Sequence, residues 1–434
     1  MKKVLLFTIL LLAGLIGSQV LPSMIGSQYA ALGDIIRMLT MVCLSFIMIH
    51  VGYEFDIDKS NLSQYGWDYI VAFTAASFPW IFVTLYFIFI VLPSGSWDLL
   101  AAWQETLLAG RFAAPTSAGV LFSMLAAAGL GATWLFHKAR VLAIFDDLDT
   151  VLLMIPLKIL MIGLAWQLGV IAVIMVVMIS IAYIYLHKIR IPNSWPWIIG
   201  YSAVITAISE LIYYQSKLID ESVPVHIEVL LPAFVLGCVM AYPSNDKSHV
   251  HMESPNEKRA STFVAAAFMV LVGLSMPMIW EGDFSAPGGA MSESVEPSLH
   301  SAGSPTSEAS AAKIGEEQNL GRITAAQPQM PWSEIAFHVL IITLISNLGK
   351  MFPAFCYRKE AHWKERLALS IGMWPRGEVG AGVLVISISY GIGGPVVTIA
   401  ILSLGLNLML TGLFIYMVKR LTQGLPEYSQ GSTS

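Results

Sequence analysis

Twelve stretches of about 20 mostly apolar residues recur along this chain of 434 residues, and they constrain its fold more than any other feature. An apolar helix of that length matches the hydrocarbon core of a bilayer. Charged residues make up 12% of the chain and apolar residues 56%, whereas soluble domains average about 25% and about 45–50%. The sequence therefore predicts an all-α polytopic membrane protein and excludes a soluble enzyme, a nucleic-acid binder and a disordered scaffold. The predicted spans are about 4–21, 34–53, 67–92, 103–127, 141–163, 167–187, 195–214, 223–242, 261–280, 333–356, 367–390 and 395–418.

The basic residues between the spans predict the orientation of the chain. With the N-terminus inside, 16 of the 24 lysines and arginines fall on the cytoplasmic side, four fall outside and four lie within spans. Because basic loops are retained in the cytoplasm, we expect a multi-pass protein of the cell (inner) membrane with both termini cytoplasmic. The first span, about 4–21, is expected to be an uncleaved helix, since no small-x-small cleavage site follows it.

The longest connection, about 282–330, differs in composition from the rest of the chain. It is rich in Ser, Ala, Gly, Pro and Glu and has few large apolar residues. Such a segment buries too little apolar surface to offset the entropy of ordering it. We therefore expect a disordered or weakly helical loop on the outer side.

Three spans carry ionisable residues that are costly at mid-bilayer, by at least about 2.5–3.5 kcal/mol each. They are the pair Asp146-Asp147, Lys350 and Arg376. Measured from the nearest cytoplasmic arginine, Asp147, Lys350 and Arg376 lie roughly 10, 12 and 15 Å deep, at about 1.5 Å per helical residue. Opposite charges at a similar depth on three spans predict one polar site.

The paired aspartates predict more than a structural ion pair. Adjacent residues on a helix point about 100° apart, so Asp146 and Asp147 cannot both face one partner. One can pair with Lys350 while the other faces an aqueous cavity. Two carboxylates facing one lysine leave a surplus negative charge that a cation or proton has to balance. The alternative is a buried ion-pair network that only fixes packing.

Two spans are interrupted near this level. Pro115 removes a backbone hydrogen bond in the fourth span, and Pro375 and Gly377 interrupt the eleventh. The carbonyls freed by the first break and the hydroxyls of Thr116 and Ser117 are candidate cation ligands. One broken span in each half of a chain is typical of an inverted-repeat transporter with its site near the midplane.

Other ionisable residues lie near the ends of spans. Arg111 and Lys158 are close enough to the outer interface for their side chains to snorkel to it. His50, Glu54 and Asp56 cluster at the cytoplasmic end of the second span, where we expect solvated side chains.

With these motifs in place, the chain resembles the cation:proton antiporter superfamily, in particular its bacterial sodium/proton antiporter branch with an Asp-Asp ion-binding pair. The motifs occur in the family's order: Gly52-Tyr53-Glu54-Phe55-Asp56, Pro115-Thr116-Ser117, Asp146-Asp147, Gly349-Lys350 and Arg376-Gly377-Glu378-Val379-Gly380. Together they span about 52–380, and the twelve-span pattern covers the chain.

The resemblance implies a role for each matching residue. Asp147 would bind the transported cation, expected to be sodium, or a proton, and Asp146 would pair with Lys350. Thr116 and Ser117 would add ion ligands, while Lys350, Arg376 and Glu378 would compensate charge. No cofactor is expected.

The family's architecture implies an alternating-access antiporter of two parts. Core helices at about 67–163 and 333–418 would move against scaffold helices at about 1–66 and 167–280, which form a homodimer interface. Members with the Asp-Asp pair tend to be electrogenic.

Two features bear on ion choice, and three other functions remain open. Asp149 adds a third carboxylate, which affects stoichiometry and ion choice. The chain ends 14 residues after Arg420, without the regulatory domain of potassium-efflux relatives, which favours sodium. The alternatives are a potassium/proton antiporter, a cation channel and an intramembrane enzyme. A protease dyad would place its aspartates on different helices, whereas these are adjacent on one.

Overall fold

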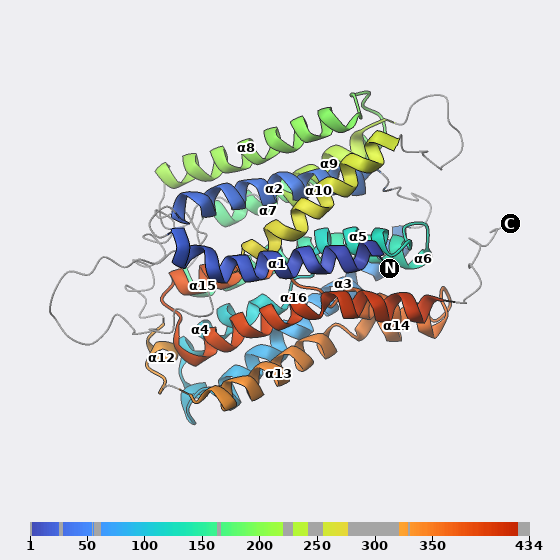
Figure 1. Cartoon of the computed structure of the whole chain (residues 1–434). Coiled ribbons are helices and arrows are strands. Elements are labelled where there is room, and N and C mark those ends of the chain that lie inside the picture. The colour runs from blue at the N-terminus through green and yellow to red at the C-terminus, as the bar shows by residue number, and fades with distance from the viewer. Residues whose placement is uncertain are drawn as a thin grey trace.

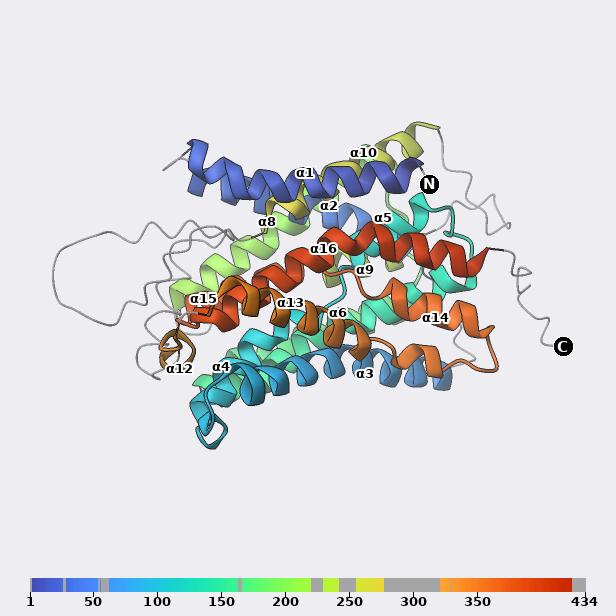
Figure 2. The ribbon, with the colours of Figure 1, turned by 60° about the horizontal axis from the view of Figure 1, so that its bottom comes forward.

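The computed structural model describes residues 2–25, 29–53, 55, 62–162, 166–219, 229–241, 255–276, 321–328 and 330–423. Within these residues the chain is helical apart from short connections and one isolated bridge between Ile189 and Met240. The long helices lie side by side as a bundle (Figure 1). The start of α1 and the end of α16 lie at the same end of the bundle in both views (Figures 1 and 2).

Each of the twelve predicted spans overlaps at least one helix, so the all-α membrane fold is confirmed. The helices of the first half are α1 (Lys2–Ile25), α2 (Tyr29–Tyr53), α3 (Leu62–Tyr86) continued by the π-helix η2 (Phe87–Val91), the short η3 (Ser96–Asp98), α4 (Leu100–Gly110), the 3-10 turn η4 (Arg111–Ala113), α5 (Ala118–Ala127), α6 (Trp134–Ile162) and α7 (Trp166–Ile184). Those of the second half are α8 (Trp195–Ile219), α9 (Leu230–Val239), α10 (Pro255–Leu274), α12 (Arg322–Ala325), α13 (Trp332–Gly349), the 3-10 turn η5 (Phe352–Phe355), α14 (Trp363–Gly372), α15 (Glu378–Ser389) and α16 (Gly394–Thr422).

Six helical segments of the described chain are long and apolar enough by themselves to cross a membrane. They lie at Lys2–Pro22, Leu32–Tyr53, Gln64–Val91, Trp195–Ser216, Trp332–Phe355 and Gly394–Thr422. The fourth and eleventh predicted spans fall short because each is split into two helices. The fifth, α6, carries three aspartates in its middle. Three of the six predicted spans that fall short thus form the polar site, and the other three correspond to α7, α9 and α10.

Both predicted interruptions are confirmed. The fourth span is divided into α4 with η4 and α5, and residues 114–117 between them are not helical. The eleventh span is divided into α14 and α15, separated by residues 373–377. The backbone at Ser117 is extended, and its hydroxyl accepts a hydrogen bond from Val120 N–H at the start of α5. A proline lies within each break, Pro115 in the first and Pro375 in the second, and the hydroxyl of Ser117 caps the start of α5 after the first break.

Glycines bring two helix pairs into backbone contact. A Cβ atom on Gly14 of α1 would lie 2.2 Å from the carbonyl oxygen of Val270 in α10. A Cβ atom on Gly52 of α2 would lie 2.2 Å from that of Phe234 in α9. Small residues let membrane helices approach closely and gain van der Waals contact, so these glycines define how the two pairs pack.

The helices associate in two groups. In the first, α3 packs on α6 and α13, and α16 packs on α13 and α14. In the second, α1 packs on α10, and α2 packs on α8, α9 and α10. The groups meet where α1 contacts α16 and where α1, α2 and α10 contact α5. The division into core and scaffold helices and the relative movement of the two groups both stay predictions.

Most of the predicted external loop, residues 282–320, lies outside the described residues. Residues 321–328 at its end are described and contain the short helix α12 (Arg322–Ala325), as a weakly helical loop would. There α12 packs against α4 and α16, and the carboxylate of Glu105, which is 0% exposed, accepts the backbone N–H groups of Ile323 (3.3 Å) and Thr324 (2.8 Å). Composition could not reveal this contact, because its partner lies 218 residues earlier in the chain.

Candidate functional site

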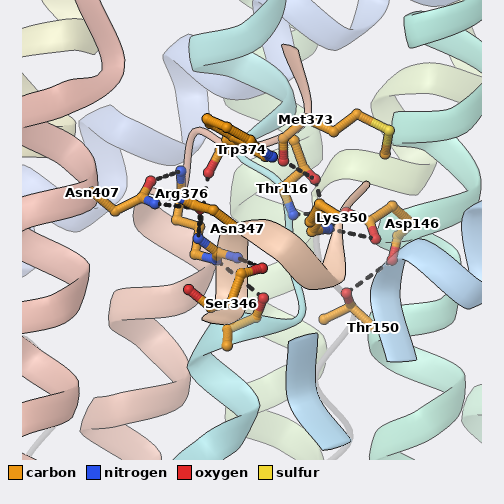
Figure 3. Close-up of polar contacts among 11 residues, drawn as sticks. Thr116, Asp146, Thr150, Ser346, Asn347, Lys350, Met373, Trp374, Arg376 and Asn407 are labelled. Carbon is orange, nitrogen blue, oxygen red and sulfur yellow. Dashed lines mark hydrogen bonds and ion pairs between the residues drawn. The ribbon is translucent and has the colours of Figure 1, made fainter. Parts of the chain in front are cut away.

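The two interrupted spans cross and are hydrogen-bonded to each other at their breaks. The backbone N–H of Ser117 donates to the carbonyl oxygen of Pro375 at 3.0 Å. The hydroxyl of Thr116 donates to the carbonyl oxygen of Met373 at 3.1 Å (Figure 3). A Cβ atom on Gly377 would lie 2.9 Å from Ser117 Oγ, so glycine at this position lets the two breaks approach closely. Backbone groups released by one break are therefore satisfied by the other.

Asp146 and Lys350 form a fully buried ion pair beside this crossing. Lys350 Nζ lies 3.0 and 3.1 Å from the two carboxylate oxygens of Asp146, and both side chains are 0% exposed. Lys350 also donates to Thr116 Oγ1 at 2.8 Å. The backbone N–H of Thr116 donates to Asp146 Oδ2 at 2.7 Å. The ammonium and carboxylate are thus charge-paired and hydrogen-bonded, as buried ions require (Figure 3).

Asp147 follows Asp146 on α6 and is also buried, with 7% of its surface exposed. It points about 100° away from Asp146 around the helix, so it does not share that residue's position against Lys350. Lys350 still lies within the electrostatic influence of Asp147. The geometry therefore distinguishes the two aspartates: Asp146 is bound by Lys350 and Thr116, whereas Asp147 lies on a different face of α6.

Arg376 donates hydrogen bonds to carbonyl oxygens at the C-terminal ends of two helical segments. Its guanidinium donates from Nε to the Ala113 oxygen at 3.0 Å and from Nη2 to the Ser346 oxygen at 2.9 Å. Nη1 donates to Asn347 Oδ1 at 2.8 Å. Ala113 ends η4, and Ser346 lies in the last turn of α13. Because carbonyl ends of helices carry partial negative charge, the buried cation is stabilised by dipoles as well as by hydrogen bonds.

Asn347 and Asn407 belong to this network, and sequence reasoning missed both. Asn407 of α16 accepts the backbone N–H of Arg376 at 3.2 Å and donates to Asn347 Oδ1 at 2.9 Å. A signal was present, since each is an amide within a predicted membrane span and a buried amide needs polar partners.

The structure overturns the expectation that Arg111 snorkels to the outer interface. Arg111 is 0% exposed, donates from Nη2 to the carbonyl oxygen of Thr150, and lies with its guanidinium carbon 4.8 Å from the centre of the Trp80 ring. The side chain extends inwards because η4 lies next to α3 and α4 next to α6. Arg111 is therefore a further buried cation near the aspartates of α6.

Asp149 lies one turn beyond Asp146 on α6 and is fully buried. The hydroxyl-bearing side chain of Tyr69 interacts with its carboxylate. Among the described side chains around the crossing, carboxylates and cations are equal in number. The three carboxylates are Asp146, Asp147 and Asp149, and the three cations are Arg111, Lys350 and Arg376. The surplus of negative charge expected from Lys350 alone is thus reduced by the two arginines.

Four predicted residues lie outside what the structure describes. They are Glu54 and Asp56, together with the side chains of Lys158 and Glu378. The other predicted site residues, Thr116, Ser117, Asp146, Asp147, Lys350 and Arg376, all lie within or beside the crossing.

Comparisons with known proteins agree with this architecture. The family model described as "Sodium/hydrogen exchanger, transmembrane" matches residues 3–419. Among solved structures, the fold is similar to that of the sodium proton antiporter MjNhaP1 from Methanocaldococcus jannaschii at pH 8. The identity is 15% and the TM-score 0.52, over 96% of this chain and 91% of that one. No curated protein sequence matches the chain.

Proposed function

This chain belongs to the sodium/hydrogen exchanger family and is a multi-pass membrane antiporter of cations and protons, and on that premise we propose that the two ions compete for Asp147. A carboxylate binds either a proton or a cation at one position, and binding of one disfavours the other. Competition for a single carboxylate therefore couples the two fluxes without a separate sensor for each ion.

The contacts of Asp146 support Asp147 as the exchanging group. Asp146 is bound by Lys350 on both oxygens and by Thr116 N–H on one. A cation arriving at Asp146 would have to displace a buried ammonium, and the released ammonium would be left without its carboxylate, which is costly. Asp147 lies beside this pair on another face of α6, so it can change its occupant while the pair stays intact.

We propose Thr116 and Ser117 as further oxygen ligands, because they lie in the non-helical segment beside Asp146. The Thr116 hydroxyl already accepts from Lys350 and donates to Met373. The Ser117 hydroxyl has a longer contact, 3.4 Å from Val120 N. Both residues are therefore proposed as ligands, and the contacts of Thr116 also give it a positioning role.

The transport cycle we propose is alternating access in a homodimer, with the α3–α6 and α13–α16 helices moving against α1, α2 and α7–α10. Two observations support this cycle. The helices pack in two groups, and the two interrupted spans, which both belong to the first group, are hydrogen-bonded to each other at the crossing. The distribution of basic residues, 16 inside against four outside, supports cytoplasmic termini and an inner-membrane location. The family supports sodium as the cation, with potassium as the alternative.

The test is exchange by purified protein in liposomes that contain a pH-sensitive dye. An inward-acid gradient is imposed, and sodium, lithium or potassium is added in turn. We expect sodium-dependent alkalinisation that Asp147→Asn abolishes and that Asp34→Asn, a change at an exposed aspartate of α2, leaves intact. Exchange retained by a folded Asp147→Asn protein would exclude Asp147 as the shared site. A larger response to potassium than to sodium would favour the alternative cation.

A further inference from the structure

A cavity of about 210 Å³ lies away from the crossing, between the two groups of helices. Its wall comes from α1, α2 and α10 on one side and from α5 and α6 on the other. A buried water needs only about 10–15 Å³ of such volume, so the cavity has room for a group much larger than one ion. Much of the wall is apolar, including Phe7, Phe46, Phe122 and Phe136.

The polar part of the wall is basic. Lys3 of α1, His50 of α2 and Lys258 of α10 line the cavity. Within the described part of the chain, neither lysine ammonium forms an ion pair with a carboxylate. Three hydroxyl-bearing residues, Ser123, Ser261 and Thr262, complete the polar lining. Hydrogen-bond donors from several helices, including the exposed Lys3 and Lys258, thus line one partly open space.

Helix ends add to the positive potential. Lys3 lies in the first turn of α1, and Lys258 lies in the first turn of α10. The N-terminal end of a helix carries partial positive charge and exposed N–H groups, and it favours anions. Glu257, the acidic residue of that turn of α10, is not part of the lining. The turn therefore presents its lysine to the cavity without its glutamate.

His50 is oriented by its own helix. Its Nδ1 lies 3.0 Å from the carbonyl oxygen of Phe46, which can only accept, so Nδ1 carries a proton. In the described residues no hydrogen bond engages Nε2.

We propose that this cavity binds a phosphate group, either the headgroup of an acidic phospholipid or a free phosphate ion. A phosphate group has several acceptor oxygens and up to two negative charges, which match two lysines, a histidine and hydroxyl donors arranged around it. The apolar wall would accommodate the glycerol and upper acyl chain of a lipid. The cavity contains none of the residues of the ion crossing, so the proposal is independent of Asp147.

The test measures binding to the full-length protein in neutral detergent micelles. The thermal unfolding midpoint is followed against inorganic phosphate, with chloride at equal ionic strength as reference. It is also followed against phosphatidic acid, with phosphatidylcholine as reference. Each titration gives a half-saturating concentration.

The double variant Lys3→Gln/Lys258→Gln should weaken binding about 30-fold, which corresponds to about 2 kcal/mol. The matched control Lys188→Gln/Lys364→Gln removes two lysines that do not line the cavity and should leave binding unchanged. Ser261→Phe places a bulky side chain in the cavity and leaves both lysines in place. This variant should abolish binding.

A response to phosphatidic acid alone would identify a lipid headgroup, and a response to both probes would identify the phosphate group itself. The proposal is overturned if neither probe stabilises the wild-type protein. It is equally overturned if Ser261→Phe binds normally, or if the control pair weakens binding as much as Lys3→Gln/Lys258→Gln does.

Discussion

Arg376 donates its Nε proton to the carbonyl oxygen of Ala113 across the point where the two interrupted spans cross. Three residues later, the N–H of Thr116 donates to the carboxylate of Asp146. One break thus presents carbonyl oxygens to a cation and an N–H group to an anion. Arg376 and Asp146 thus each meet backbone groups of opposite polarity, which makes a non-helical backbone tolerable at membrane depth.

The Asp146–Lys350 pair should behave as one unit in stability. Asp146→Asn keeps an acceptor for Thr116 N–H but leaves the Lys350 ammonium without its counter-charge, so we expect a loss of about 3–5 kcal/mol. Adding Lys350→Met removes that charge and should restore at least half of the loss. The measurement is a double-mutant cycle of chemical unfolding in detergent. Strictly additive effects of the two changes would show that the residues are not coupled.

Arg376→Lys should destabilise the protein although the charge is kept. A lysine offers a compact ammonium and cannot reach the oxygens of Ala113, Ser346 and Asn347 together. At least one buried acceptor loses its donor, at about 1–3 kcal/mol each. Thermal unfolding of the variant checks this, with the exposed Arg358→Lys as control, for which we expect a change within about 0.5 kcal/mol. Equal stability of both variants would contradict the proposed network.

Glu105→Ala should release the ordered segment that contains α12. The substitution removes the acceptor of two backbone N–H groups, and hydrogen bonds to a charged group contribute about 1.5–3 kcal/mol. Local opening should become roughly 10- to 100-fold more frequent, and trypsin should cleave after Arg322 faster by a similar factor. The control is Glu334→Ala, at a side chain that is 50% exposed. Unchanged cleavage would mean that other contacts hold the segment.

Gly52→Ala and Gly66→Ala should have opposite effects on stability. A methyl group at Gly52 would overlap the Phe234 carbonyl in α9, and overpacking costs about 1–3 kcal/mol. At Gly66 of α3 no atom lies within 4 Å of the new Cβ, so the helix gains about 0.5–1 kcal/mol. Unfolding midpoints of the two variants compare them directly, and a stabilised Gly52→Ala protein would show that α2 and α9 can separate at no cost.

The positions of the spans, their two interruptions and several residues of the crossing were predictable from the sequence. Each depends on a local signal: hydrophobic runs of bilayer length, prolines inside them, and charges that a bilayer does not tolerate without a partner. Pro115, Pro375, Asp146 and Lys350 therefore stand out without any knowledge of tertiary contacts.

What each charge contacts was decided only by the tertiary structure. The inward direction of Arg111, the carbonyl ends bound by Arg376, the part played by Asn407 and the contact between Glu105 and α12 all join residues distant in the chain. The energy of a buried polar group depends on the partner that packing brings to it, and a linear pattern records the need for a partner but not its identity.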